Sequence, residues 1–556
     1  MLNTERGIDM NYSRYKKAYF AVPPFERNWP KREIKKAPAW CSVDLRDGNQ
    51  ALVAPMTAEE KLYFFSYLVR IGFKEIEVGF PAASDTEFSF IRTLIEKNLI
   101  PDDVTVQVLS QIRPHILKRT FEAIDGAKRA IVHIYNSTSR VQREAVFNFT
   151  PDETVALAKE GAEMCLEMAK SVHCEHLTFE YSPESFSATE PEIALRTVNA
   201  VIDAFAPAKD NKLIINLPET VQLSTPNVYA DMVEYISENM HNRENVILSI
   251  HTHNDRGCAV ASSELGILAG AQRVEGTLFG NGERTGNADI MVLALNLFSQ
   301  GIDPKLELSD MAHLIKTYED STKMPVPPRH PYAGELVYTA FSGSHQDAIK
   351  KSLEYSAAHN LKLWQNPYLP IDPEDIGRDY EPIRINSQSG AGGIRYVLES
   401  KYGIYAPKDM ITEFALLIKN MSDKKASELP HETIYLAFAE NYVSRQDHLA
   451  LLDYKVTSSD GETSITASFG GELEGEFTAS GNGPLDALNN LLRENLKTEL
   501  EIVSYSEHAL EEKSSSRAMA FITLRVGDRL FYGAGISTNI STASMEALIS
   551  AYNRSK

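Results

Sequence analysis

Two histidines at the end of an apolar stretch are the first residues in this chain whose type and spacing indicate chemistry. The segment ILSIHTHND covers residues 247–255, and its first half is apolar enough to form a buried strand. Side chains two residues apart on a strand point to the same face, so His251 and His253 would project together at its carboxyl end. Two converging imidazoles suit a borderline divalent cation. The alternative is a pair of hydrogen-bonded surface histidines, and a third ligand decides between the two interpretations.

The segment DLRDGNQ, residues 44–50, supplies a candidate third ligand. Asp47 would complete a face of two histidines and one carboxylate that leaves positions open for a substrate. Arg46 would clamp an anion or an oxygen that gains negative charge. Asn287 would either supply its side-chain carbonyl oxygen to the metal site or hold one of the ligands in place without binding the metal itself. The competing interpretations are a cap or turn role for Asp47 and a buried ion pair for Arg46.

The elements that must bring these segments together are strands that alternate with helices between residues 39 and 325. Near-continuous apolar strands in this pattern indicate a parallel sheet, and eight units in about 250 residues fit a (β/α)8 TIM barrel better than an open doubly wound sheet. The expected strands are WCSV (40–43), EIEVGF (75–80), VTVQVLS (104–110), RAIVHIY (129–135), HLTFEY (176–181), KLIINL (212–217), NVILSI (245–250) and RVEGTLF (273–279). Polar residues follow nearly every strand, and barrel closure would place the first strand beside the eighth and near the seventh.

The composition is that of an ordinary soluble globular protein. The chain has 556 residues, of which 43% are hydrophobic and 24% charged, and its formal net charge is −20. This acidic balance argues against a general nucleic-acid or anionic-membrane binder. The four cysteines form no C-x-x-C pair, so we expect thiols in a reducing compartment. Because no signal-peptide core and no apolar run of ~18 residues occurs, the sequence predicts a cytoplasmic protein with no membrane span.

The rest of the chain divides into three predicted regions. Residues 1–38 are polar and proline-punctuated, as in an extended N-terminal arm. Residues 326–430 resemble a linker with small helical subdomains, and residues 431–556 a C-terminal α+β domain.

A weak internal repeat marks the C-terminal domain. In each copy a hairpin signal is followed by a glycine turn and a helix. The turns contain Gly481 and Gly483 in the first copy and Gly533 and Gly535 in the second. Backbone N–H groups at a helix N-terminus can receive the carboxylate of an amino acid. The alternatives are tight turns without a ligand and a domain that only holds a dimer together.

Three separated motifs resemble the 2-isopropylmalate synthase family, a Claisen-condensing branch of the metal-dependent aldolase-like barrels. The motifs are DLRDGNQ (44–50), HTHNDRG (251–257) and EGTLFGNGERTGN (275–287), and the resemblance covers about residues 15–550, including SGSHQDAI (342–349). It implies condensation of acetyl-CoA with 3-methyl-2-oxobutanoate and hydrolysis of the thioester to 2-isopropylmalate and CoA. This is the first committed step of leucine biosynthesis, and the resemblance further implies inhibition by leucine and a homodimer.

The resemblance also implies roles for individual residues. Arg46 would stabilise the oxygen that gains charge, while a base removes the methyl proton of acetyl-CoA. Glu184, His345 and Tyr368 would serve this half-reaction, and the sequence leaves open which of them takes the proton. The two linker residues would reach the site from the same subunit or from the other one. The implied cofactors are a divalent metal ion (Mg²⁺, Mn²⁺ or Zn²⁺) and K⁺ as an activator.

Further residues are implied in binding the two substrates. The 2-oxo acid pocket would consist of Arg46, Leu109, His133, Ser182, Asn216, Pro218 and Thr220. Gly280, Asn281 and Gly282 would approach CoA, because glycine permits close backbone contact with a ligand. The alternatives are rim packing and capping, a buried core histidine at position 133, and a tight turn in the glycine loop.

Two other functions stay open. A sister synthase that makes citramalate or homocitrate would differ in pocket size and polarity. A non-catalytic homologue would bind leucine or CoA. The set Arg46, Asp47, Glu184, His251, His253 and His345 argues against the second, because a decayed site would have lost at least one of these residues.

Overall fold

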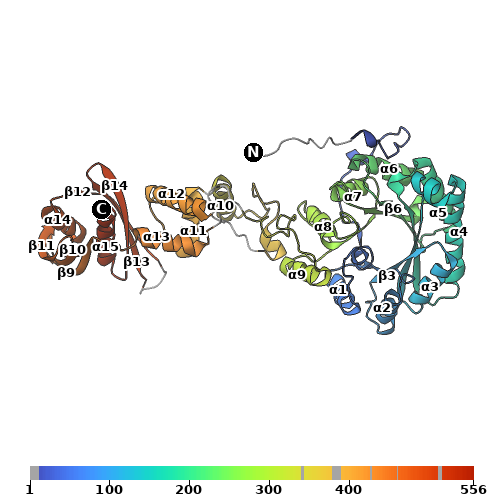
Figure 1. The fold of residues 1–556 in the computed structure, drawn as a ribbon, viewed down its shortest axis with the longest axis horizontal. Helices are drawn as coiled ribbons and strands as arrows, with labels where there is room; N and C mark the ends of the chain where they lie inside the picture. The colour runs from blue at the N-terminus through green and yellow to red at the C-terminus, as the bar shows by residue number, and fades with distance from the viewer. Residues whose placement is uncertain (1–11, 340–342, 379–389, 426–428, 460, 511–515) are drawn as a thin grey trace, which may run out of the picture. The chain divides into compact units, whose positions relative to one another are not determined.

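The structure, a computed structural model, describes residues 12–339, 343–378, 390–425, 429–459, 461–510 and 516–556 (Figure 1). The chain forms two compact units. The first comprises Met1–Val337 and Pro373–Arg378, and the second comprises Tyr338–Asp372 and Asp379–Lys556. No helix among the described residues is long and apolar enough to cross a membrane.

The first unit contains a closed barrel of eight parallel strands in the order β1 to β8, as the sequence predicts. The strands are β1 Ala39–Ser42, β2 Glu75–Gly79, β3 Thr105–Gln111, β4 Arg129–Ser137, β5 His176–Glu184, β6 Leu213–Glu219, β7 Val246–Thr252 and β8 Arg273–Gly276. β1 pairs in parallel with both β2 and β8, which closes the sheet. β8 ends three residues earlier than predicted. A Cβ atom on Gly276 would lie 2.5 Å from the carbonyl oxygen of Ala288, so the returning chain crosses close to the strand here.

Helices surround the barrel (Figure 1). They are α1 Ala58–Arg70, α2 Asp85–Glu96, α3 Pro114–Ile124, α4 Pro151–Ala169, α5 Pro191–Phe205, α6 Pro226–Asn239, α7 Ala259–Leu268, α8 Ile290–Phe298 and α9 Met311–Thr322. Their starts follow from local sequence. Thr57 and Thr150 cap α1 and α4 in capping boxes with the glutamate three residues later. Proline in the first turn of α3 to α6 supplies a backbone angle already suited to a helix.

Residues 27–32 of the N-terminal arm lie against α6. Arg27 donates two hydrogen bonds of 2.7 Å to Asp231, and the indole of Trp29 donates a third to the same carboxylate. Arg32 pairs with the buried Glu234 at 3.1 Å. Two acidic side chains of α6 are therefore covered and neutralised by the arm.

The second unit combines helices with two antiparallel sheets. Its helices are α10 Gly343–Ala358, α11 Ala391–Tyr402, α12 Lys408–Lys425, α13 His431–Tyr442, α14 Pro484–Leu496 and α15 Ile540–Asn553. Its strands are β9 Leu449–Ser459, β10 Glu462–Gly471, β11 Gly475–Gly481, β12 Leu500–Ala509, β13 Ala518–Val526 and β14 Arg529–Ser537. The sheets have the orders β11-β10-β9 and β12-β13-β14. Three strands followed by a helix thus occur twice, in agreement with the predicted repeat.

The sheet β12-β13-β14 is covered on both faces. Alternate residues of β13 point to opposite faces. Ala520 and Ile522 belong to a core with α14 and α15. Met519 and Phe521 belong to a core with α11, α12 and α13.

The prediction of a second glycine turn is wrong. Gly533 and Gly535 lie inside β14, where α15 packs against the strand with no room for a side chain. A Cβ atom on Gly535 would lie 2.0 Å from the carbonyl oxygen of Ala543, and one on Gly533 would lie 2.2 Å from that of Ala547. The first turn is as predicted, since Gly481 ends β11 and Gly483 caps α14.

Candidate active site

A cavity of about 270 Å³ opens at the carboxyl ends of the barrel strands. Eleven residues singled out from the sequence line it: Arg46, Asp47, Leu109, His133, Ser182, Glu184, Asn216, Pro218, Thr220, His251 and His253. Six lining residues were not predicted: Gln50, Phe80, Gln111, Tyr135, Glu283 and Arg284. Gln111 and Tyr135 follow Leu109 and His133 at a spacing of two. The period of a strand would therefore have indicated them.

Asp47, His251 and His253 face one another at one side of this cavity. The Oδ2 atom of Asp47 lies 4.0 Å from Nε2 of His251 and 3.9 Å from Nε2 of His253. All three side chains are buried. Asp47 is held in the helical turn Asp44–Gly48 that follows β1, and the histidines stand at the end of β7. The barrel therefore brings together the ligand set that the spacing predicts.

The second nitrogen of each histidine is fixed by an acceptor. Nδ1 of His251 lies 2.8 Å from the Glu275 carboxylate, and Nδ1 of His253 lies 3.2 Å from the carbonyl oxygen of Gly286. A carboxylate and a carbonyl can only accept, so each Nδ1 is the donor and each Nε2 is turned toward Asp47. Histidine ligands of metal ions are held in this way.

Asn287 completes the group of ligand atoms. Its Oδ1 atom lies 2.8 Å from Nε2 of His251, and its amide nitrogen donates to Asp47 at 2.6 Å. The loop before it closes tightly, because a Cβ atom on Gly282 would lie 2.2 Å from this amide nitrogen. Two imidazoles, a carboxylate and an amide oxygen form a donor set that fits a divalent metal ion.

The surroundings of two predicted metal ligands, Asp47 and His253, favour the forms that bind a cation, whereas Glu275 and Asp47 raise the pKa of His251 despite its burial. Burial alone would raise the pKa of Asp47, but Arg46, His251 and His253 outweigh it and lower that pKa to about 2. Burial, together with the nearby His251, lowers the pKa of His253 to about 4. At neutral pH Asp47 is therefore a carboxylate and His253 a neutral imidazole, which are the forms that bind metal ions.

Arg46 is both a buried ion-pair partner and a wall of the cavity. Its Nε donates to Glu77 at 2.5 Å and its Nη1 to Asp47 at 2.7 Å. Burial opposes the charged form, but the two carboxylates outweigh it and raise the pKa of Arg46. A permanent positive charge thus stands beside the predicted metal ligands.

His133 and Glu184 occupy other walls of the cavity. Nε2 of the buried His133 lies 2.7 Å from the Ser182 hydroxyl, and its Nδ1 lies 3.0 Å from Glu77. His133 is therefore a hydrogen-bonded buried histidine and also a lining residue. Glu184 ends β5 and accepts a hydrogen bond from the Ser137 hydroxyl.

His345 and Tyr368 lie together in the second unit. Their rings stack with centroids 4.1 Å apart and an interplanar angle of 24°. His345 is exposed in the first turn of α10, and Tyr368 is 47% exposed. Their participation in the barrel chemistry stays a prediction.

Gly280, Asn281 and Gly282 are not among the residues that line the barrel cavity. The buried Asn281 donates to the carbonyl oxygen of Gly48 at 3.1 Å, and its own carbonyl accepts from Asn287. The tight-turn alternative accounts for this geometry, and contact with CoA stays a prediction.

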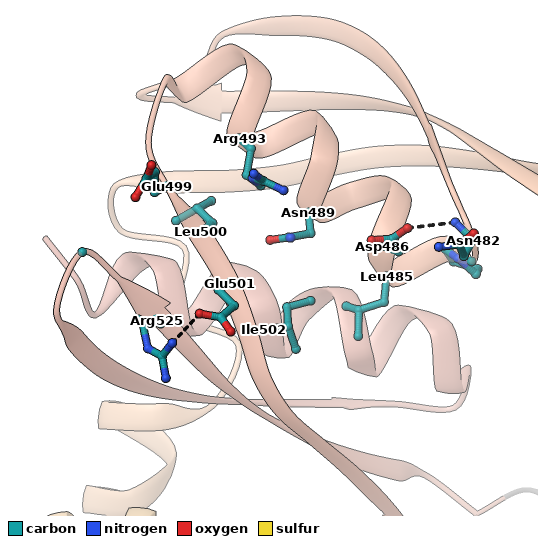
Figure 2. Close-up of a pocket in the computed structure, with 13 residues that line it drawn as sticks. Asn482, Leu485, Asp486, Asn489, Arg493, Glu499, Leu500, Glu501, Ile502 and Arg525 are labelled. Carbon is teal, nitrogen blue, oxygen red and sulfur yellow. Dashed lines mark hydrogen bonds and ion pairs between the residues drawn. The ribbon is translucent and has the colours of Figure 1, made fainter.

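A second cavity, of about 690 Å³, lies in the C-terminal region between α14 and β12 (Figure 2). Figure 2 shows Asn489 and Arg493 of α14 on one wall and Leu500, Glu501 and Ile502 of β12 on the other. The turn Asn482–Pro484 closes one end. Of the four glycines predicted to be regulatory, Gly483 alone lines this cavity.

Comparison with known proteins finds relatives that cover nearly the whole chain. Residues 37–317 match the HMGL-like family model, residues 335–399 the alpha-isopropylmalate synthase post-catalytic domain-like model, and residues 428–556 the LeuA allosteric (dimerisation) domain. The 2-isopropylmalate synthases of Helicobacter hepaticus and Acetoanaerobium sticklandii are each 52% identical to this chain. The alignments cover 98% of it in both cases, and 100% and 97% of the respective relatives. That of Clostridium acetobutylicum is 51% identical over 98% of this chain and 100% of the relative.

Proposed function

The chain belongs to the 2-isopropylmalate synthase family, and from this premise we propose how its residues divide the work of the reaction. The enzyme is an acyltransferase that condenses acetyl-CoA with 3-methyl-2-oxobutanoate and releases 2-isopropylmalate and CoA, the first committed step to leucine. The observation that carries the proposal is the convergence of Arg46, Asp47, His251 and His253 on one cavity.

Asp47, His251, His253 and the amide oxygen of Asn287 would hold the divalent metal ion. When bound, such an ion supplies electron withdrawal from the carbonyl group of the 2-oxo acid. Mg²⁺, Mn²⁺ and Zn²⁺ are the candidate ions. K⁺ as an activator is part of the proposal, without an assigned site.

Arg46 and Glu184 would act directly on the reacting atoms. The methyl group of acetyl-CoA gives a proton to a base, and its carbon then bonds to the ketone carbon of the 2-oxo acid. Arg46 stabilises the ketone oxygen as it gains negative charge, and Glu77 and Asp47 hold the guanidinium in place. Water then cleaves the thioester, which releases CoA as a thiol. We propose that Glu184, His345 and Tyr368 handle the protons of the acetyl-CoA half-reaction.

The cavity favours a 2-oxo acid with a single carboxylate. Both arginines among its described lining residues are already paired, Arg46 with Glu77 and Asp47, and Arg284 with Asp255 at 2.7 Å. A second carboxylate, as in 2-oxoglutarate, would meet no unpaired arginine there. This supports 3-methyl-2-oxobutanoate over the substrate of a homocitrate synthase.

We propose that leucine binds the C-terminal cavity. Leu485 of α14 and, on the opposite wall, Leu500 and Ile502 of β12 offer apolar surface for its side chain (Figure 2). The N-terminus of α14, after Gly483, offers backbone N–H groups to its carboxylate. The buried Oδ1 atom of Asn489 has no hydrogen-bond partner within the described part of the chain and could accept from its ammonium group. Gly481 would shape the turn, while Gly533 and Gly535 would act only through packing.

The remaining assignments are proposals as well. The description of the C-terminal family as a dimerisation domain supports a homodimer. The four free cysteines are consistent with the reducing cytoplasm. The family matches support a barrel over residues 39–325, linker subdomains over 326–430 and a leucine-regulatory domain over 431–556, after an arm over residues 1–38.

A thiol-release assay tests the proposal. Purified protein with Mn²⁺ and acetyl-CoA is given 3-methyl-2-oxobutanoate, pyruvate or 2-oxoglutarate in separate reactions, with and without leucine. We expect the first acid to react with the highest kcat/KM and leucine to inhibit. Faster reaction with 2-oxoglutarate or pyruvate would assign the chain to a sister synthase, and no reaction with any of them would favour a non-catalytic homologue.

A further inference from the structure

The buried carboxylate of Glu275 contacts residues of both the predicted metal site and the proposed 2-oxo acid pocket. Glu275 on β8 is fully buried and is not among the residues that line the cavity. Its Oε2 atom lies 2.8 Å from Nδ1 of His251 and accepts from the Asn216 amide at 3.2 Å. Glu275 therefore joins a predicted metal ligand to a residue of the proposed 2-oxo acid pocket.

The other oxygen of Glu275 is anchored inside the barrel. Its Oε1 atom accepts from Arg273 Nη1 at 2.9 Å and from the Gln107 amide at 2.8 Å. Arg273 is itself fixed, because it also donates to Ser249 at 2.9 Å and to Glu75 at 2.5 Å. Gln107 and Glu180 also accept from it, so a buried arginine with five different hydrogen-bond partners leaves the carboxylate of Glu275 only one orientation.

The orientation of the Glu275 carboxylate determines the tautomer of His251 and the orientation of the Asn216 amide. A carboxylate only accepts, so Nδ1 of His251 must carry its proton and Nε2 is the nitrogen turned to the metal site. The Asn216 amide is fixed in the same way. Its nitrogen donates to Glu275 and, at 3.0 Å, to Ser182. A flipped amide would set its oxygen against the carboxylate. Asn216 Oδ1 is left buried, without a hydrogen-bond partner in the part of the chain that the structure describes.

We propose that Glu275 is a positioning residue that sets the His251 tautomer and the Asn216 amide together, so that one carboxylate orients the metal side and the 2-oxo acid side of the cavity. Arg273 and Gln107 hold that carboxylate. The inference rests on the proposed metal site, and it goes beyond that site by giving both halves of the cavity a common support.

Replacing Glu275 by glutamine makes a sharp test. Arg273 and Gln107 both donate to the anchored oxygen, so the oxygen of a glutamine amide would stay on their side. Its NH₂ group would then face Nδ1 of His251 and the Asn216 amide, which are also donors. His251 would have to adopt the opposite tautomer, with an N–H on the nitrogen that should bind the metal.

Glu180 provides a matched control. It is fully buried in the same layer, lies 3.4 Å from Arg273 Nη1 and hydrogen-bonds to Glu275, but no hydrogen bond or ion pair joins it directly to His251 or Asn216 among the described contacts. Burial raises the pKa of Glu180 well above its usual range. Glutamine is therefore the matched replacement, because it is uncharged, as burial favours here, and its NH₂ group can still donate to Glu275.

The experiment compares E275Q, E275D and E180Q with the parent enzyme. Mn²⁺ affinity is measured by calorimetry without substrates, and KM and kcat for 3-methyl-2-oxobutanoate are measured at saturating Mn²⁺. We expect E275Q to weaken Mn²⁺ binding about 10- to 100-fold and to raise KM. E275D, which keeps the charge, should retain more affinity than E275Q, and E180Q should bind Mn²⁺ within about twofold of the parent.

Mn²⁺ affinity in E275Q within twofold of the parent would overturn the inference, even if its turnover falls, because Glu275 would then be a core residue only. An equal loss in E180Q would overturn it too, by pointing to general damage to the buried layer. If E275Q does not fold, E275D becomes the test. Its side chain is one methylene shorter and cannot reach both Arg273 and His251, so we expect a partial loss, and Mn²⁺ affinity equal to that of the parent overturns the inference. Failure of the proposed function is a separate result, namely no thiol release by the parent with 3-methyl-2-oxobutanoate.

Discussion

Every carboxyl group that is buried among the described residues lies in the barrel unit, whereas the second unit buries only uncharged polar side chains. The barrel set is Asp44, Asp47, Glu77, Glu180, Glu219, Asp231, Glu234, Glu275 and Asp289. The second unit instead packs small residues closely, as where α15 lies on Gly533 and Gly535. A buried charged side chain fixes the orientation of its neighbours, because it needs a particular partner. Close apolar packing fixes the distance between a helix and the strand it covers. We therefore expect changes in the barrel to alter chemistry and changes in the C-terminal region to alter packing and ligand response.

The largest effect should come from a metal ligand. His253→Ala is expected to lower kcat/KM at least about 100-fold, because one of the few neutral ligands of the site is lost. The barrel should remain folded, since His253 lies beyond the last residue of β7. Circular dichroism and metal analysis of the purified variant check both points. Stoichiometric tightly bound metal with near-normal turnover would contradict the ligand assignment.

The next largest effect should be on stability, in the second unit. Gly535→Val places a side chain where the backbone of α15 already lies, with even its Cβ atom 2.0 Å from the carbonyl oxygen of Ala543. We expect a loss of about 3 kcal/mol or more in the stability of this unit, read from the denaturant midpoint of its transition. Gly483→Ala is the control, because a Cβ atom there meets no atom within 4 Å. Equal midpoints for the two variants would show that α15 moves away from β14 at little cost, so that this packing does not fix the distance between them.

A moderate effect is expected at the wall of the C-terminal cavity. Ile502→Ala removes apolar surface beside the proposed leucine site and should weaken inhibition by leucine about tenfold, with uninhibited turnover unchanged. Val503→Ala, at the exposed neighbouring position, is the matched control and should leave the inhibition constant as it is. If both variants respond to leucine like the parent, leucine binds elsewhere.

The smallest effect should be a pH dependence confined to the barrel. Burial raises the pKa of Asp44 to about 7, against the opposing hydrogen bonds from Ser42 and Leu278. An unfolded aspartate titrates near pH ~4. Between these values the folded state keeps a proton that the unfolded state has lost. Its stabilising contribution is therefore complete below about pH 4 and is lost as the pH rises through about 7.

Asp44→Asn should remove this dependence. The midpoint temperature of the barrel is expected to rise by about 2–4 °C relative to the parent at pH 8 and to change little at pH 4. Asp210→Asn, at an exposed position, should follow the parent at both pH values. Scanning calorimetry at the two pH values makes the measurement. A difference from the parent that is the same at pH 4 and pH 8 would show that Asp44 does not titrate in this window.

The barrel was predictable because strands and active-site positions follow general rules. Apolar strands at regular spacing can be recognised in the sequence, and the functional residues of a parallel barrel lie at the carboxyl ends of its strands. His251, His253 and Asp47 therefore met as expected, although more than 200 residues separate Asp47 from the histidines.

The support behind the site was not predicted, although a signal was present. Glu75 and Glu77 lie two apart on β2, as do Arg273 and Glu275 on β8. Charges spaced by two within a buried strand share one face, which here is the interior of the barrel. The glycines of β14 were misassigned for a different reason. Glycine serves both a turn and a close helix contact, and the sequence does not distinguish the two.

The packing of α15 on β14 also limits how this enzyme can be altered by selection. A side chain at Gly533 would meet Ala547 and Ala551, and one at Gly535 would meet Ala543 and Ala547, so the two glycines share Ala547 as a neighbour. A single substitution at either glycine would destabilise the second unit. Such variants would be lost from a mutant library as unfolded protein, before any change in regulation could be measured. Compensating changes would have to arise together on both elements. Libraries seeking leucine-insensitive variants should therefore place their diversity on the walls of the C-terminal cavity and leave this strand–helix contact as it is.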